Sequence, residues 1–267
     1  MLSNRVRQIF AGTVCVLTLV LFIYSFWGRA VEPRPERPGG AAHWMHKAQS
    51  GEVKSQCEGV RRLKKFHSPE TLELVLGKLE SEHVAVRIAA ASTLGAYRDS
   101  GAVRPLAAIA LADAEHPIAR DKAIHALGQI GDPKALPALK TLLQPAKDDP
   151  QGWGLQSAVA IARLRTPEAQ PLLIEALRSP DPWTRSGAIK GLAICGGPGA
   201  VDALRQLAER PARGLDQALY EWLFPYHATA GEPDIHGPEK AEDTEFRALC
   251  RRAITAINAR LARQEGG

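Results

Sequence analysis

The sequence predicts an all-α fold, an α-solenoid built from about five repeated helix pairs. Three observations predict it. An apolar anchor residue recurs at intervals of 31 to 34 residues, a small residue stands four positions before each anchor, and a second apolar residue follows about 12 positions later. The anchors are Leu63, Leu94, Leu127, Ile161 and Leu192. A repeat of this length is typical of a helix pair that buries its apolar stripe against the neighbouring pairs.

The other two positions of the repeat indicate how each pair is built. The second apolar position holds Val75, Leu106, Leu139, Leu173 and Leu204, and the small position holds Gly59, Ala90, Ala123, Ser157 and Ala188. Small side chains let a neighbouring helix approach closely. Between the two halves stands a cap-like residue, usually followed by proline, as in Ser68-Pro69 and Asp132-Pro133. Proline suits the first helical position because its missing N–H would have no intrahelical partner.

These signals divide the repeat region into helix pairs and leave a different pattern after it. We expect pairs over 52–80, 84–111, 117–144, 152–178 and 182–209, all within a solenoid domain of residues 51–210. Residues 211–267 are predicted to form C-terminal capping helices, over 215–226 and 243–263. The second of these has an apolar stripe from Phe246 to Leu261 and an arginine-rich opposite face. An end unit must cover the open core, although a basic amphipathic helix can also lie on a membrane.

Three ten-residue segments carry a resemblance to a known family. They are VRIAAASTLG at 86–95, ARDKAIHALG at 119–128 and TRSGAIKGLA at 184–193. They resemble the HEAT-like repeats of the armadillo-type α-solenoid superfamily, in particular the short repeats of the phycobilin-lyase type. The resemblance covers about 160 of the 267 residues. It implies a stack of helix pairs, and it does not imply one function, since such repeats serve unrelated roles. Gly154 stands at the position that Arg87, Arg120 and Arg185 hold in three of the other units.

The amino-terminal fifty residues differ from the rest in composition. Residues 9–27 form an uncharged apolar run after a short tail of residues 1–8, and such a run is long enough to cross a bilayer. We expect a transmembrane signal anchor there, followed by a Pro/Gly-rich stalk over 28–50. Cleavage of a signal peptide near Gly28 and Ala30 is the alternative. The predicted location is a bacterial inner membrane, single-pass, with the solenoid on the periplasmic side. Basic residues flank both ends of the run, so they do not decide the orientation.

Charge and cysteine content exclude two classes of function. Residues 1–50 carry six Lys and Arg against two Asp and Glu, so they hold four of the five net positive charges. The repeat region is therefore nearly neutral, which does not fit a nucleic-acid-binding domain. Cys15, Cys57, Cys195 and Cys250 are widely separated and match neither a zinc site nor a disulfide framework.

Catalytic motifs are missing from the sequence. It has no glycine-rich phosphate loop, no Gly-x-Ser-x-Gly segment and no His-Glu-x-x-His segment. It also has no His-Glu dipeptide, which the resemblance to HEAT-repeat proteins such as deoxyhypusine hydroxylase would require for an iron site. His227, Asp234 and His236 share one late loop and could gather a metal, but a solvated loop is the simpler interpretation. We therefore predict a protein that is not an enzyme, with no cofactor, metal or small-molecule substrate.

The predicted function is that of a membrane-anchored HEAT-repeat scaffold or adaptor that binds a protein partner, with a membrane complex as one candidate. The alternative is an enzyme or maturation factor of the phycobilin-lyase type, acting on a prosthetic group or a modified protein. The resemblance implies that the second helices of the pairs line the concave, partner-binding side. Charged residues on those helices, away from the leucine stripe, are the candidate partner-binding residues. They are Arg104, Lys140, Glu175, Arg178, Asp202 and Arg205.

Overall fold

The computed structural model describes residues 39–144, 153–209 and 238–265. The chain divides into two compact units, Met1–His43 and Trp44–Gly267. Of the first unit only residues 39–43 are described, and the account below concerns the second. Every regular element among the described residues is helical, and none is a strand. The all-α prediction is confirmed.

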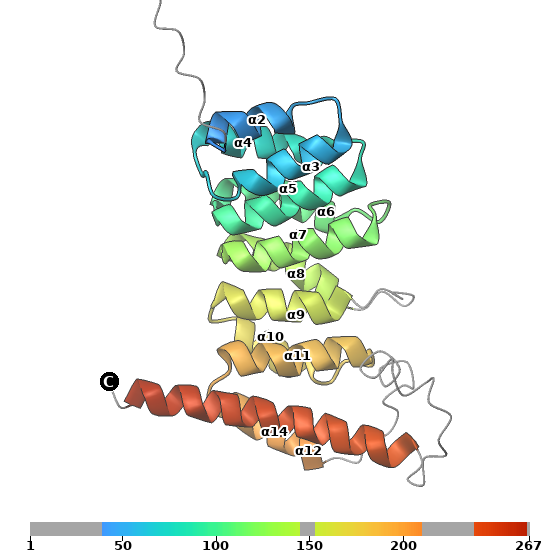
Figure 1. The fold of residues 1–267 in the computed structure, drawn as a ribbon. Helices are drawn as coiled ribbons and strands as arrows, with labels where there is room; N and C mark the ends of the chain where they lie inside the picture. Colours follow the sequence, from blue (N-terminus) through green and yellow to red (C-terminus); the bar gives the residue numbers. More distant parts are fainter. Residues whose placement is uncertain (1–38, 145–152, 210–237, 266–267) are drawn as a thin grey trace, which may run out of the picture. The chain divides into compact units, whose positions relative to one another are not determined.

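Paired helices follow one another in the order that the repeat predicts. The pairs are α3 (Val53–Leu63) with α4 (Pro69–Gly77), α5 (Val84–Tyr97) with α6 (Val103–Leu111), α7 (Pro117–Ile130) with α8 (Leu136–Leu143), α9 (Trp153–Leu164) with α10 (Ala169–Ala176), and α11 (Pro182–Cys195) with α12 (Pro198–Glu209). Short 3-10 helices η1 (Lys78–Glu80), η2 (Ser100–Ala102) and η3 (Pro133–Ala135) adjoin some of them. The first helices α3, α5, α7, α9 and α11 pack each against the next (Figure 1). Helix α2 (Ala41–Ala48) lies within the range predicted as a stalk.

Side-chain caps begin several of the second helices, as the sequence predicts. Ser68 and Thr71 form a capping box at the start of α4, with Pro69 in the first turn. The Asp132 carboxylate accepts a hydrogen bond from the Lys134 N–H at 2.8 Å at the start of η3. In the second unit the cap is Asp99, one residue before the position that the repeat indicates. Each cap satisfies a backbone donor that the helix itself leaves unpaired.

The ten apolar positions of the repeat form the centre of the core. All five anchors and all five second apolar residues have 0% exposure. They belong to one continuous cluster that runs from Ala48 to Ile257. The register predicted from the sequence is therefore the register in which the helices pack.

Small residues set the distance between successive first helices. A Cβ atom added to Gly128 of α7 would lie 2.8 Å from the Cα of Ala160 in α9. A Cβ added to Gly95 of α5 would lie 2.9 Å from the Cα of Ala126 in α7. Both distances are shorter than a normal van der Waals contact, so only glycine allows the two backbones to pack this closely.

Arginines near the starts of α5, α7 and α11 donate hydrogen bonds to backbone carbonyls at or just after the end of the preceding second helix. The Arg87 guanidinium donates to the Ser81 carbonyl at 2.7 Å, and that of Arg185 donates to the Ser179 carbonyl at 2.8 Å. The Arg120 Nε donates to the Ala110 carbonyl at 3.1 Å. The fourth unit has Gly154 at this position instead of an arginine. A Cβ atom there would overlap the Thr184 hydroxyl of α11, so the contact between α9 and α11 requires glycine.

Arg87 also forms an ion pair with Glu115. Its Nε and Nη2 atoms donate to the two carboxylate oxygens at 2.8 and 2.6 Å. The hydrogen bonds from Arg87 hold the pKa of Glu115 below its usual value. A folded-state pKa below the unfolded one means that this carboxylate stabilises the fold at neutral pH. That contribution is lost as the pH falls through the lowered pKa.

Helix α14 (Pro238–Glu265) packs against α11 and α12 at the carboxyl end of the repeat (Figure 1). Cys250, Ala253 and Ile257 are buried there, which confirms the apolar stripe. The Arg260 guanidinium donates to the Ala193 carbonyl at 2.8 Å and also to the Ile194 and Gly196 carbonyls. It therefore satisfies carbonyl groups at the end of α11. The predicted helix over 215–226 lies outside the described residues.

The membrane prediction requires a correction. No helix in the described part of the chain is long and apolar enough to span a bilayer. The predicted anchor over 9–27 lies outside the described residues. On this finding, the prediction of a single-pass membrane protein with a periplasmic solenoid is wrong.

The close contact at Gly128 predicts the cost of adding one methyl group. Gly128→Ala should lower the free energy of unfolding by about 1–3 kcal/mol, since the new Cβ meets the Ala160 backbone rather than a side chain that can move. Urea denaturation measures this change. Gly77→Ala is the matched control, because a Cβ at that helical position meets nothing within 4 Å. It should leave stability unchanged or raise it by up to about 1 kcal/mol. Equal stability of the two variants would contradict the packing argument.

The Arg87–Glu115 pair predicts a pH-dependent effect. Glu115→Gln should lower the melting temperature at pH 7, where the native carboxylate is ionised, and the difference from wild type should shrink as the pH falls below about 4. Melting curves across this range measure it. Glu73→Gln, at an exposed carboxylate of α4, is the control and should show no such trend. A Glu115→Gln difference that is constant with pH would count against the ion pair.

Candidate functional site

The six candidate residues all lie on or just after second helices. Arg104 is on α6, Lys140 is in the last turn of α8, and Glu175 is on α10. Arg178 follows α10, while Asp202 and Arg205 are on α12. All six are exposed. We call the exposed side of α6, α8 and α10 the second-helix surface.

Three of the six residues surround one cavity. Lys140, Glu175 and Arg178 line a space of about 480 Å³ between α8 and α10, together with Gln144 and Ser179. Leu143 and Ala176, which are both buried, give it an apolar part. The turn after α10 positions Arg178, because its N–H donates to the Glu175 carbonyl at 2.9 Å. The helical path therefore continues past α10, and residues three apart lie on the same face.

A second cavity lies on the other side of α8. It has a volume of about 620 Å³, and Arg104 of α6 and Lys134 of η3 both line it. Lys134 is a residue that the sequence analysis missed. A signal was available, because Lys134 follows the Asp132-Pro133 restart and so belongs to the second half of its unit, as Arg104 does. Helix α8 forms a wall of both cavities, with Pro137 and Thr141 on one side and Lys140 on the other.

Asp202 and Arg205 are arranged differently from the other four candidates. They pair with each other, the Arg205 Nη1 lying 3.5 Å from the Asp202 Oδ1, and their side chains are 69% and 59% exposed respectively. Neither residue lines either of the two cavities. An exposed pair of this kind contributes little energy. The structure thus brings Lys140, Glu175 and Arg178 together and leaves the α12 pair apart from them.

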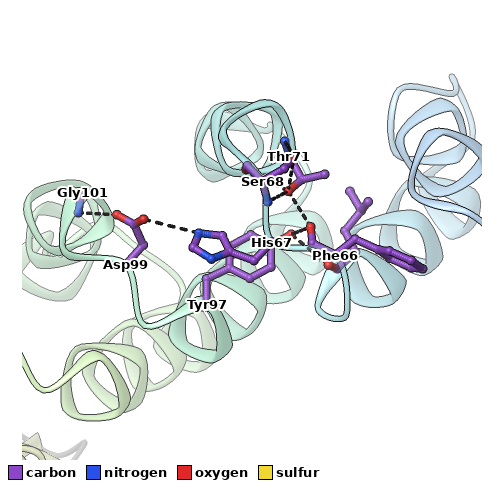
Figure 2. Close-up of polar contacts among 8 residues, drawn as sticks. Phe66, His67, Ser68, Thr71, Tyr97, Asp99 and Gly101 are labelled. Carbon is purple, nitrogen blue, oxygen red and sulfur yellow. Dashed lines mark hydrogen bonds and ion pairs between the residues drawn. The ribbon is translucent and has the colours of Figure 1, made fainter.

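A serine and a histidine in the turn between α3 and α4 lie near an aspartate in the turn after α5, a set that resembles a catalytic triad by composition (Figure 2). The His67 Nε2 lies 3.4 Å from the Asp99 Oδ2, while the Asp99 Oδ1 accepts from the Gly101 N–H at 2.8 Å. The Ser68 hydroxyl accepts from the Thr71 N–H at 3.3 Å. No hydrogen bond links His67 to Ser68 in the ranges that the structure describes. A nucleophilic serine requires that bond to its base.

The same turn is fixed by Tyr97. The Tyr97 hydroxyl donates to the Leu63 carbonyl at 2.9 Å, and its ring stacks on His67 with 4.7 Å between ring centroids (Figure 2). Burial raises the pKa of Tyr97, so the hydroxyl remains protonated and able to donate. The cluster therefore holds the first two units in register and has a structural role.

The thiols of Cys195 and Cys250 are unsuited to nucleophilic chemistry. Burial raises the pKa of Cys195, and it raises that of Cys250 to about 11. The reactive form is the thiolate, which is scarce at neutral pH when the pKa is this high. Across the three described ranges, no group of three or more His, Cys, Asp and Glu side chains could hold a metal ion. The loop with His227, Asp234 and His236 lies outside those ranges.

The fold and its two cavities define an α-solenoid protein with an exposed, charged surface on its second helices. The chain belongs to the HEAT repeat family: the model for HEAT repeats matches residues 42–120 and 154–222, more than half of the chain. The model for the PBS lyase HEAT-like repeat matches residues 119–145 between them. The family predicted from the sequence is therefore confirmed. A comparison with curated proteins found no match.

Solved structures with the same arrangement include the complex of CpcE and CpcF of phycocyanin lyase from Nostoc sp. PCC7120. It is 18% identical, covers 80% of this chain and 86% of that one, and has a TM-score of 0.51. At this identity the likeness shows the fold alone. Human deoxyhypusine hydroxylase (13% identity, 82% and 96% coverage, TM-score 0.33) and an engineered protein (17%, 82% and 96%, TM-score 0.44) overlay less closely.

Proposed function

We propose that this chain is a non-catalytic scaffold or adaptor that binds a protein partner through its second-helix surface. The observation that carries the proposal is the cavity between α8 and α10. Lys140 comes from one repeat unit and Glu175 and Arg178 from the next, yet all three line it. A site assembled from neighbouring units is how a solenoid forms an extended binding surface.

The chemistry of this surface supports a protein partner. The cavity combines apolar side chains with charges of both signs, and protein interfaces have a comparable mixture of apolar core and polar rim. Arginine is among the residues that are enriched at such interfaces. A second cavity one helix away, lined by Arg104, extends the surface beyond the size of a single small-molecule site.

A second candidate function is a maturation factor of the lyase type that handles a prosthetic group. The match of residues 119–145 to the PBS lyase HEAT-like repeat favours it. Both cavities also fall within the range of about 300–1,000 Å³ that small-molecule sites occupy. On this candidate the chain itself would handle the prosthetic group, whereas on the scaffold proposal it would only bind a protein partner.

Charge reversal tests the first proposal. Lys140→Glu with Arg178→Glu should weaken binding of the natural partner about tenfold or more, because both reversed charges line the proposed site. The partner is captured from a native extract on the wild-type chain, purified, and titrated against wild type and variant by calorimetry. Both residues are exposed, so the free energy of unfolding should change by no more than about 0.5 kcal/mol.

The matched control reverses two exposed lysines in and after α3, Lys54→Glu with Lys65→Glu. This variant has the same change in net charge and should bind the partner like the wild type. Equal weakening in both variants would indicate a general charge effect. Unchanged affinity in the Lys140/Arg178 variant would reject the second-helix surface as the binding site.

A spectroscopic measurement separates the two candidate functions. On the scaffold proposal, the purified chain mixed with an open-chain tetrapyrrole should retain no stoichiometric absorbance after gel filtration. Retention of one chromophore per chain, with loss of that absorbance in the Lys140/Arg178 variant, would favour the maturation factor instead.

A further inference from the structure

The exposed cations that line the two cavities lack ion-pair and side-chain hydrogen-bond partners in the described part of the protein. Arg104 and Lys134 line one cavity, and Lys140 and Arg178 line the other. In the part of the chain that the structure describes, none of these four side chains forms an ion pair or a side-chain hydrogen bond. Glu175 is the single acidic residue among those lining either cavity.

Arginines that maintain the fold have a different environment. The Arg87 guanidinium is bound by the Glu115 carboxylate and by backbone carbonyls, and its side chain is 17% exposed. Arg120 lies against the Trp153 ring, with its guanidinium carbon 4.9 Å from the ring centroid, and is 11% exposed. Structural cations are thus shielded and paired here, whereas the four around the cavities are exposed and hold their charge toward solvent.

The cationic surface is bounded on both sides. Glu70 and Glu73 are exposed on α4, the second helix before α6. On α12, the second helix after α10, the charge of Arg205 is balanced by Asp202. The excess of positive charge is therefore confined to the two cavities and the helix between them.

From this charge distribution we infer that the partner presents an acidic, extended peptide segment whose carboxylates enter the two cavities on either side of α8. The inference rests on the proposed function and names the chemistry of its partner. Arginine binds a carboxylate through two parallel hydrogen bonds, and a lysine beside it adds a further donor. Each cavity supplies one arginine and one lysine.

The helix spacing sets the spacing of the acidic residues. An α-helix with its side chains is about 10–12 Å across, and an extended chain advances about 3.3 Å per residue. Two carboxylates about three positions apart therefore span α8 and reach both cavities. In the cavity between α8 and α10, the Glu175 carboxylate is available to accept a hydrogen bond from a peptide N–H or hydroxyl.

Glu175 also disfavours nucleic acid as the occupant. A nucleic-acid backbone has a negative charge at every phosphate and would bring several charges past this carboxylate, whereas a peptide needs only one carboxylate in the cavity and can direct it to Lys140 and Arg178. The acidic residues of α4 would oppose the continuation of a charged backbone beyond the cavities. A peptide can place its carboxylates at intervals and present neutral groups elsewhere.

Selection from a random library tests the inference. Peptides of about twelve residues are selected on the full-length wild-type chain at low salt, and their composition is compared with that of the starting library. We expect enrichment of Asp and Glu about three positions apart. The best such peptide should lose affinity about tenfold or more when its acidic residues become Asn and Gln, and by a similar factor on the Arg104→Glu/Lys134→Glu/Lys140→Glu/Arg178→Glu chain. The Lys54→Glu/Lys65→Glu chain should bind it like the wild type.

The outcomes distinguish failure of this inference from failure of the proposed scaffold function. Selected peptides that bind through the four residues but lack acidic enrichment would overturn the inference and leave the scaffold function standing. Acidic peptides that bind the fourfold variant as well as the wild type would also overturn it, as would selection of no binder. A labelled single-stranded oligonucleotide that binds more tightly than the best peptide, and is lost in the fourfold variant, would assign the surface to nucleic acid instead. Failure of the natural partner to respond to Lys140→Glu/Arg178→Glu is the separate result that rejects the function.

Discussion

Backbone-to-backbone contact between successive first helices is the constraint from which the rest of the structure follows. Gly95 against Ala126 and Gly128 against Ala160 leave no room for a Cβ on either glycine. Because these contacts fix how one unit sits on the next, they also fix where each second helix lies relative to the one before. The cavities on either side of α8 are a consequence of this spacing, since their walls come from second helices that the first helices hold in place.

Charged residues consequently have different environments on the first helices and on the second helices. Charged residues near the starts of the first helices, such as Arg87, bind carbonyl groups of the preceding turn. Lys140 and Arg178, on and just after second helices, form no ion pair or side-chain hydrogen bond in the described part of the chain. Paired charges within the protein can be replaced only at a cost in stability, whereas exposed ones can change freely. Substitutions of exposed charges such as Lys140 and Arg178 should therefore change the surface without changing the fold.

The sequence predicted the fold well because a repeated pattern tests the same hypothesis several times. All five anchors from Leu63 to Leu192 are buried, and the predicted pairs match the helices to within a few residues. Lys134 was missed because the register of a repeat shows which residues are buried, not which exposed side chains share a cavity. That depends on the distance between helices. The membrane location was wrong because one apolar run carried it, with no repeat to test it against.

Fold and function separate in this protein for a physical reason. The ten core positions fix the helix stack, yet none of them contributes a charge to the surface. A relative with the same stack can therefore have any set of charges around its cavities and still fold. The similarity to a phycocyanin lyase complex concerns the shared stack, so it carries no information about the residues that line the cavities here. The set of cations on either side of α8 is in this sense independent of the core that specifies the fold.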